Sequence, residues 1–497
     1  MTSHAPGAVP DGDVGSRVVK GGFQRSAGFI ATNLLSVAGA VLLLRYLGLE
    51  DFGRFGVVMA LVNIVYGVSD AGLTLTGSRE LAILPDDSAR RTLLSHLLAM
   101  RIALTGVGVT VAVGFAAIAG YDSELVVGTA VAGLGIFLAS VQAAMLLPLN
   151  VELRNSRIAV NEVLRQAVLV VAFAVLVVAG AGLVAFFAAQ VFTGVVLLLA
   201  TLILLERRHF ARPRWSNRQM RALLGVALPI AIANVLGIMY LRILVILMSL
   251  LSDSAAEVGD YVTSTRVIEL VAGLPFLLVS VVLPVQAVAA LQDRQRVGYI
   301  TARMTETMAA GGILVAVFVS FAAEPIIRLL GGDEFAGAVP VLQIQCLAVV
   351  TIFLASAWNP AIVALGHAKS LVATTGTGVV VVLLAGVVLI PRYEAEGAAV
   401  AAALADLALC IATFVALRRA SPETRLAKGR LARIALAAVL AIGVGLAPPA
   451  HDAVSAIAAA AAFVAAALLL KAVPGELLDG VRALRQRASS SARSSSS

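Results

Sequence analysis

The sequence has little of what a soluble enzyme requires, beginning with charge. Only 13 % of its 497 residues are charged and 5 % are aromatic, whereas 60 % are hydrophobic. A soluble domain carries about 25 % charged residues, so this composition excludes an ordinary soluble fold. The two cysteines, Cys346 and Cys410, both lie in apolar runs, which argues against a disulfide scaffold or a cysteine-based metal site. We expect both to be small buried core residues.

The sequence also lacks the motifs of catalysis. There is no Gly-rich Lys-Ser/Thr phosphate loop, and the five histidines do not have metal-ligand spacing. No basic-aromatic motif indicates a nucleic-acid partner. The longest gap between apolar runs, 282–307, is too short for a soluble catalytic domain. We therefore predict that the protein is not an enzyme, with no catalytic residues, no cofactor, no metal site and no nucleic-acid partner.

Long apolar runs fill the chain instead. A bilayer core about 30 Å thick is crossed by roughly 20 apolar residues in a helix, because every backbone polar group must be satisfied within the segment. The pattern predicts an all-α polytopic membrane protein with about 14 transmembrane helices, of which the thirteenth is the shortest. The predicted spans are 27–47, 55–75, 97–120, 125–147, 163–180, 183–204, 223–250, 261–281, 308–327, 341–365, 371–390, 397–417, 434–446 and 454–470.

The positive charges alternate between the gaps. Nearly all Lys and Arg fall in every second gap, and we group Arg101, near the start of the third span, with them. Cytoplasmic loops carry the excess of Lys and Arg, so both termini are predicted to be cytoplasmic, which requires an even number of spans. The net charge of +8 is mostly this topological signal. We expect a multi-pass protein of the cell inner (plasma) membrane.

Two segments recur in the same order six spans apart. Residues 30–35 (IATNLL) match 232–236 (IANVL), and 50–55 (EDFGRF) match 256–261 (AEVGDY). Transporters are often built from such repeated halves. We predict two six-helix lobes plus two C-terminal helices. The predicted parts are a cytoplasmic N-terminal tail (1–26), an N-lobe of helices 1–6 (27–204), a cytoplasmic inter-lobe loop (205–222), a C-lobe of helices 7–12 (223–417), a cytoplasmic loop (418–433), helices 13 and 14 (434–470) and a cytoplasmic disordered tail (471–497).

Several motifs carry a family resemblance. They are LRYLGLEDFGRF at 44–55, GVSDAGL at 67–73, GDY at 259–261 and LGHAK at 365–369. At these residues the chain resembles the polysaccharide/oligosaccharide flippases (O-antigen-type flippases) of the multidrug/oligosaccharidyl-lipid/polysaccharide exporter superfamily. The last two spans fit the fourteen-helix members.

The resemblance implies a two-lobed bundle that works by alternating access. Such proteins move a polyprenyl-pyrophosphate-linked oligosaccharide or exopolysaccharide unit to the outer leaflet, the sugar passing between the lobes while the lipid tail stays in the bilayer. The implied partners are the lipid-linked glycan, membrane lipids and glycan synthesis or polymerase proteins. A proton- or cation-coupled drug antiporter of the same superfamily, a lipid II-type flippase and a non-transporting scaffold protein remain alternatives.

Three of the arginines that depart from the alternation are the predicted substrate-binding residues. A charge at a helix centre costs about 2.5–3.5 kcal/mol on insertion scales, so each calls for a partner or a function. Arg242 has no acid at i±3 or i±4; it either binds pyrophosphate in a bidentate way or reaches the outer interface. Arg266 either pairs with Glu269 at i, i+3 or contacts the substrate. Arg45 either joins a solvated cluster at the first outer turn or binds the substrate's phosphates.

Two acids within spans are the predicted coupling residues. Asp70 precedes Gly72, where a helix break would expose it. Asp406 lies in the middle of the twelfth span, where it serves either as a proton or cation site or as an interhelical hydrogen-bonding group. Drug exporters of the superfamily often carry an acid in the first span, and 27–47 has none, which disfavours the antiporter alternative. A further pair, Glu162 with Arg165, is expected to be structural.

Overall fold

The described part of the chain is helical throughout its regular elements. The computed structural model describes residues 11–70, 72–84, 86–151, 155–204, 211–252, 254–447 and 453–472. Ten helical segments in these ranges are long and apolar enough to cross a membrane. The predicted all-α, multi-pass membrane fold is confirmed. The chain forms two compact units, Met1–Arg242 and Ile243–Ser497.

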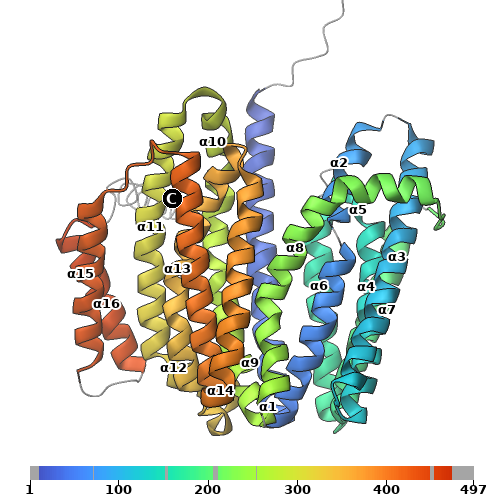
Figure 1. The fold of residues 1–497 in the computed structure, drawn as a ribbon, viewed down its shortest axis with the longest axis horizontal. Helices are drawn as coiled ribbons and strands as arrows, with labels where there is room; N and C mark the ends of the chain where they lie inside the picture. Colours follow the sequence, from blue (N-terminus) through green and yellow to red (C-terminus); the bar gives the residue numbers. More distant parts are fainter. Residues whose placement is uncertain are drawn as a thin grey trace, which may run out of the picture. The chain divides into compact units, whose positions relative to one another are not determined.

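Two of the ten segments are too long to cross a membrane once. Those that contain most of α1 (Asp11–Asp70) and all of α14 (Ala368–Ala420) have 53 residues each. A straight helix of that length would measure roughly 80 Å, against a hydrocarbon core of about 30 Å. Each is interrupted by a residue with positive φ, Gly48 at 74° in α1 and Glu394 at 46° in α14. Figure 1 shows both helices turning back, so each covers two predicted spans.

In the first unit, α1 packs against several of the other helices. The other helices of this unit are α2 (Leu73–Ile83), α3 (Asp87–Ile118), α4 (Ser123–Met145), α5 (Leu147–Val151), α6 (Asn155–Val178), α7 (Leu183–Leu204) and the first part of α8 (Asn217–Leu251). α1 packs against α6, α4 and α3, and α4 against α7. A Cβ at Gly135 would lie 2.8 Å from the carbonyl carbon of Gln190, so glycine lets α4 and α7 approach closely. Such small residues are typical of helix contacts in membranes, where packing replaces the hydrophobic effect.

The second unit is organised around α13, which packs against α14, α11 and α9. Beyond α8 its elements are α9 (Ala255–Ala272), α10 (Leu274–Gln292), α11 (Arg294–Phe321), α12 (Ala323–Gly331), the 3₁₀ turn η2 (Asp333–Phe335), α13 (Ala338–Ala364), α14, α15 (Lys428–Gly445) and α16 (Ala453–Leu469). α15 begins earlier than the predicted thirteenth span, 434–446. Hydropathy marks only the part of a helix that lies in hydrocarbon, whereas the helix itself can continue beyond it. The basic first turn of α15 is therefore helical although it lies outside the predicted span.

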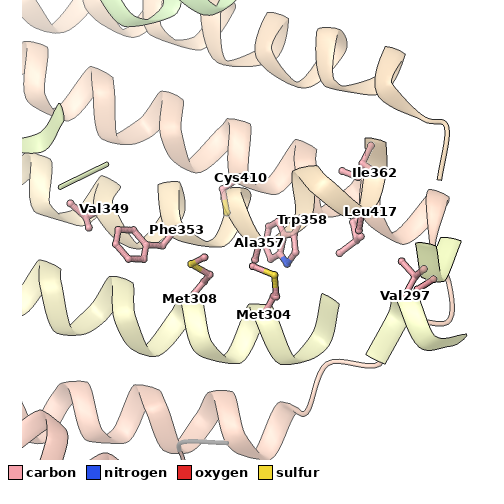
Figure 2. Packing of buried hydrophobic residues seen from close by; sticks show 12 residues of the cluster. Val297, Met304, Met308, Val349, Phe353, Ala357, Trp358, Ile362, Cys410 and Leu417 are labelled. Carbon is pink, nitrogen blue, oxygen red and sulfur yellow. The ribbon is translucent and has the colours of Figure 1, made fainter. Parts of the chain in front are cut away.

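A buried cluster ties α11, α13 and α14 together. Figure 2 shows Met304 and Met308 of α11 beside Phe353 and Trp358 of α13 and Cys410 of α14. The indole Nε1 of Trp358 donates to a threonine hydroxyl of α11 at 2.9 Å, which satisfies its single donor inside the unit. Both cysteines of the chain are free and buried, so their predicted role as small core residues is confirmed.

The lobe boundaries remain predictions. The division between the two compact units falls within α8, after Arg242, whereas the sequence analysis put the lobe boundary in the loop 205–222. Residues 1–10 of the predicted N-terminal tail, 205–210 of that loop and 473–497 of the predicted disordered tail lie outside the described residues.

Candidate functional site

The five predicted site residues lie on four helices. Arg45 and Asp70 are on α1, Arg242 on α8, Arg266 on α9 and Asp406 on α14. Arg45 is exposed, and the other four are half-buried. Asp70 and Arg266 form ion pairs with residues outside this set.

A buried ion pair joins α1 to α3 in the first unit. Arg101 donates from Nη2 to Oδ1 of Asp70, and the hydroxyl of Thr74, on α2, donates to the same oxygen. The Arg101 side chain is 3 % exposed and that of Asp70 is 20 % exposed. Arg101, which the sequence analysis grouped with the basic residues of the alternating gaps, is therefore a buried, paired charge.

The ion pair lies at a break between helices. α1 ends at Asp70 and α2 begins at Leu73, with Gly72 between them in the left-handed region at φ 68°. A side chain at Gly72 would be strained, and its Cβ would lie 2.7 Å from Cγ2 of Ile230 in α8. Glycine at this position therefore allows both the turn and the close packing of α8. The predicted helix break is confirmed, but Asp70 is held at the break by Arg101 and Thr74.

A second buried acid lies in the other unit. Glu306 of α11 is 3 % exposed and accepts hydrogen bonds from Arg303 at 3.0 Å and from Arg430 at 2.7 Å. Arg430 belongs to the first turn of α15, so the carboxylate fastens α15 to α11. The guanidinium carbon of Arg303 also lies 5.1 Å from the ring centroid of Tyr299, within cation–π range. A carboxylate buried this deeply is tolerated because it has charged partners.

The predicted local ion pairs form. Arg266 donates to Glu269 at 3.1 Å, with the two side chains 35 % and 29 % exposed. Glu162 and Arg165 pair at 3.0 Å on α6. Both pairs are partly in contact with solvent or lipid, so each contributes at most about 1 kcal/mol to stability.

Arg54 is the centre of the charge cluster at the first predicted outer turn. It forms ion pairs with Asp51 at 3.3 Å, with Glu124 at 3.0 Å, and with Asp122. Asp122 is also the N-cap of α4 and accepts from the backbone N–H of Leu125 at 2.8 Å. The cluster therefore includes acids from the next predicted outer turn.

A protein metal centre requires several His, Cys, Asp or Glu side chains close together. Among the residues that the structure describes, no group of three or more such side chains is placed to hold a metal ion. What the described parts of the two units do contain are ion pairs with a buried member, Asp70 with Arg101 in the first and Glu306 with Arg303 and Arg430 in the second.

The sequence analysis named Asp70 as a site residue but did not predict its partner, Arg101, and it did not predict the pairing of Glu306 with Arg303 and Arg430. Asp70 in the second span and Arg101 in the third carry opposite charges in neighbouring helices, and that signal was available. Glu306 had a local signal too, because Arg303 lies three residues before it. Arg430 had none, since it reaches Glu306 across 124 residues of sequence.

One family matches the chain by sequence. It is described as polysaccharide biosynthesis protein, and the match covers residues 42–340. No curated protein sequence matches.

Solved structures share the fold. The lipid II flippase MurJ in an inward-closed conformation superposes with a TM-score of 0.77 at 12 % identity, over 90 % of this chain and 98 % of that one. An inward-facing multidrug resistance MATE transporter of the MOP superfamily gives 0.67 at 13 % identity, over 79 % and 95 %. A MOP superfamily transporter from Pyrococcus furiosus gives 0.57 at 15 % identity, over 82 % and 96 %. These similarities show a common fold.

Proposed function

Because the chain belongs to the polysaccharide biosynthesis protein family, we propose that it is a flippase for a polyprenyl-pyrophosphate-linked oligosaccharide or exopolysaccharide unit. It would deliver this lipid-linked glycan to the outer leaflet by alternating access. The family match over residues 42–340 is the observation that carries the proposal. The fold supports it, since MurJ, whose fold the chain shares, is a lipid II flippase. The function needs no bond-breaking step, so the protein acts as a transporter and not as an enzyme.

The substrate's pyrophosphate is proposed to bind Arg242, Arg266 and Arg45. A guanidinium group matches two phosphate oxygens at once, which an ammonium group does not. In the ion pair between Arg266 and Glu269, both side chains are about one-third exposed. If a phosphate of the substrate replaced Glu269 as the partner of Arg266, the released carboxylate would therefore leave a position that is already partly exposed. Arg45 is exposed and Arg242 half-buried, and both are arginines of predicted spans.

Energy coupling is proposed to involve Asp406 and Asp70. The membrane potential also contributes, because moving one charge through 100 mV is worth about 2.3 kcal/mol, and an anionic head leaving a negative interior gains that energy. Asp406→Asn should make transport less dependent on the proton-motive force. Equal dependence in the variant and the parent would remove Asp406 from this role.

The orientation is part of the proposal. Both termini are placed in the cytoplasm and the protein in the cell inner (plasma) membrane, on the alternation of Lys and Arg between the gaps. This puts the loop 205–222 on the side where lipid-linked glycans are assembled, next to the synthesis or polymerase proteins that would be its partners.

Deleting the gene in its host tests the function in cells. We expect labelled lipid-linked glycan to accumulate in the inner leaflet, where an added glycosidase cannot reach it, and surface polysaccharide to disappear. A matched culture expressing the parent chain should restore both. Normal surface glycan together with lost resistance to cationic dyes would instead identify a drug antiporter. Accumulation of lipid II with normal surface polysaccharide would identify a lipid II-type flippase.

A further inference from the structure

A basic strip precedes and opens α8. We use this name for Arg212, Arg214, Trp215, Arg218 and Arg221, all of which are exposed. Trp215 is 63 % exposed, which is unusual for so large an apolar side chain. Among the residues that the structure describes, none of the four arginines forms an ion pair with an acid. Four arginines at exposed positions therefore fall within ten residues of chain.

The strip is fastened to the body of the first unit. The backbone N–H of Arg214 donates to the carbonyl of Ser95 on α3 at 3.1 Å. The ring Nδ1 of His96 donates in turn to the carbonyl of Arg214 at 2.8 Å, and His96 is only 5 % exposed. The indole Nε1 of Trp215 donates to Oδ1 of Asn217 at 2.5 Å. The arginines and the tryptophan are thus presented from a folded backbone, which lowers the entropy cost of binding a ligand.

The outer face of α8 changes from basic to apolar within two turns. Arg221, Leu224, Leu228 and Ile232 follow at intervals of three and four residues, so they lie on one side of the helix. The three apolar side chains are 38 %, 55 % and 47 % exposed. The adjacent side of the helix is buried within the unit through Met220, Ala227 and Ala231.

The basic strip lies next to a candidate membrane span. The apolar span of α8 covers Ile230–Leu251, so all five residues of the strip precede it, the last of them, Arg221, by nine positions. Figure 1 shows the first part of α8 running across the ends of neighbouring helices before the helix turns along them. Basic residues and tryptophan next to a transmembrane span are typical of the headgroup region of a membrane.

We propose that the basic strip is a binding site for the headgroup of an acidic phospholipid. Charge complementarity favours this occupant, because clusters of four or more basic residues next to a transmembrane helix attract anionic lipids. All four are arginines, which can grip a phosphate with two parallel hydrogen bonds. The site is separate from the residues proposed to bind the transported lipid, and it stands whether or not that function is correct.

Tryptophan fluorescence gives a direct test. The chain has two tryptophans, and Trp358 is only 4 % exposed, so the difference between the parent and Trp215→Phe reports on Trp215. The full-length protein is placed in nanodiscs that contain equal mole fractions of dibrominated phosphatidylglycerol or dibrominated phosphatidylcholine. We expect Trp215 quenching to give a relative binding constant for the anionic lipid on the order of tenfold. Replacing all four strip arginines by Gln should bring that ratio close to one, and replacing them by Lys should lower it less.

The control removes the same charge elsewhere. The matched variant is Arg294→Gln with Arg296→Gln, Arg425→Gln and Arg433→Gln, all at exposed positions of the second unit. Its ratio at Trp215 should equal that of the parent. Three results would each overturn the site. They are a relative binding constant near one in the parent, a tenfold constant that persists in the strip variant, and a control variant whose constant falls as far as that of the strip variant. Each variant is also made together with Trp215→Phe, so that Trp358 is its remaining tryptophan. Quenching of Trp358 equal to that in Trp215→Phe alone shows that the variant keeps its fold.

Discussion

At the scale of single residues, the pair of Asp70 with Arg101 is the feature whose removal should cost most in the first unit. Removing one member of a buried pair leaves the other charge uncompensated at a cost of about 3–5 kcal/mol. The cost comes from the remaining charge, so exchanging the two residues should be milder than removing either. The pair also holds the break between α1 and α2, at Gly72, in one arrangement.

Exchanging the charges of Asp70 and Arg101 tests whether the two residues stabilise the first unit through their ion pair or only through packing. Asp70→Asn and Arg101→Ala should each reduce glycan export and membrane abundance severely, and the double exchange Asp70→Arg with Arg101→Asp should recover part of both. Export is measured as surface polysaccharide, and abundance by immunoblot. The exposed pair Glu162–Arg165 is the control, and its exchange should change neither. Losses that are simply additive in the double variant would contradict an interaction between the two residues.

Arg242 gives the residue-scale test of substrate binding. Arg242→Ala should abolish export at normal abundance, because a phosphate partner would be lost, whereas Arg242→Lys should retain part of it. Surface polysaccharide normalised to the amount of protein in the membrane is the readout. Full export by the alanine variant would remove Arg242 from the proposed site and favour its alternative, anchoring at the interface.

At the scale of helices, the two repeated segments make corresponding contacts. Arg54 and Asp260 occupy the same position in the segments 50–55 and 256–261. In the first unit Arg54 pairs with Asp122, the N-cap of α4. In the second unit the carboxylate of Asp260 itself lies against the first turn of α13, at Gly337. Each repeated segment therefore contacts the N-terminus of a later helix of its own unit, the first through Arg54 and the second through Asp260.

Glu306 is expected to decide how firmly α15 is attached to α11. Glu306→Gln would leave Arg303 and Arg430 without their shared carboxylate, and we expect a loss of about 1–3 kcal/mol, since both arginines are about one-third exposed or less. The free energy of unfolding in detergent micelles is the measurement. In the control Glu324→Gln, the exposed partner of Arg328 is removed, and the loss should be below about 0.5 kcal/mol. Equal free energies of unfolding for Glu306→Gln and Glu324→Gln would contradict the attachment of α15 to α11 through Glu306.

The helices were predictable where composition alone decides them. An apolar run of roughly 20 residues has one low-energy state in a bilayer, so the predicted spans fall on helices even where α1 and α14 continue through the turn. Helix ends that carry charge are less predictable, because α15 begins at Lys428, inside the predicted cytoplasmic loop 418–433. Contacts between distant residues, such as Glu306 with Arg430, have no local pattern and required the structure.

At the scale of the whole molecule, the orientation follows from charge and can be tested by labelling. Cys346 and Cys410 are buried, so they should give little background with a polar maleimide. Arg212→Cys should react only after the membrane is permeabilised, whereas Ser123→Cys, in a predicted outer turn, should react in intact cells. The opposite result at both positions would reverse the topology.

The most direct measurement of the central claim is flipping by the purified protein in liposomes. A polyprenyl-pyrophosphate-linked glycan, labelled on its sugar, is placed in both leaflets, and a membrane-impermeant reagent destroys the outer label. With the parent protein, nearly all the label should be lost, because inner-leaflet lipid reaches the outside; in empty liposomes and with Arg242→Ala, about half should stay protected. Protection of half the label by the parent protein, together with proton-driven uptake of a cationic dye in the same liposomes, would contradict the flippase account.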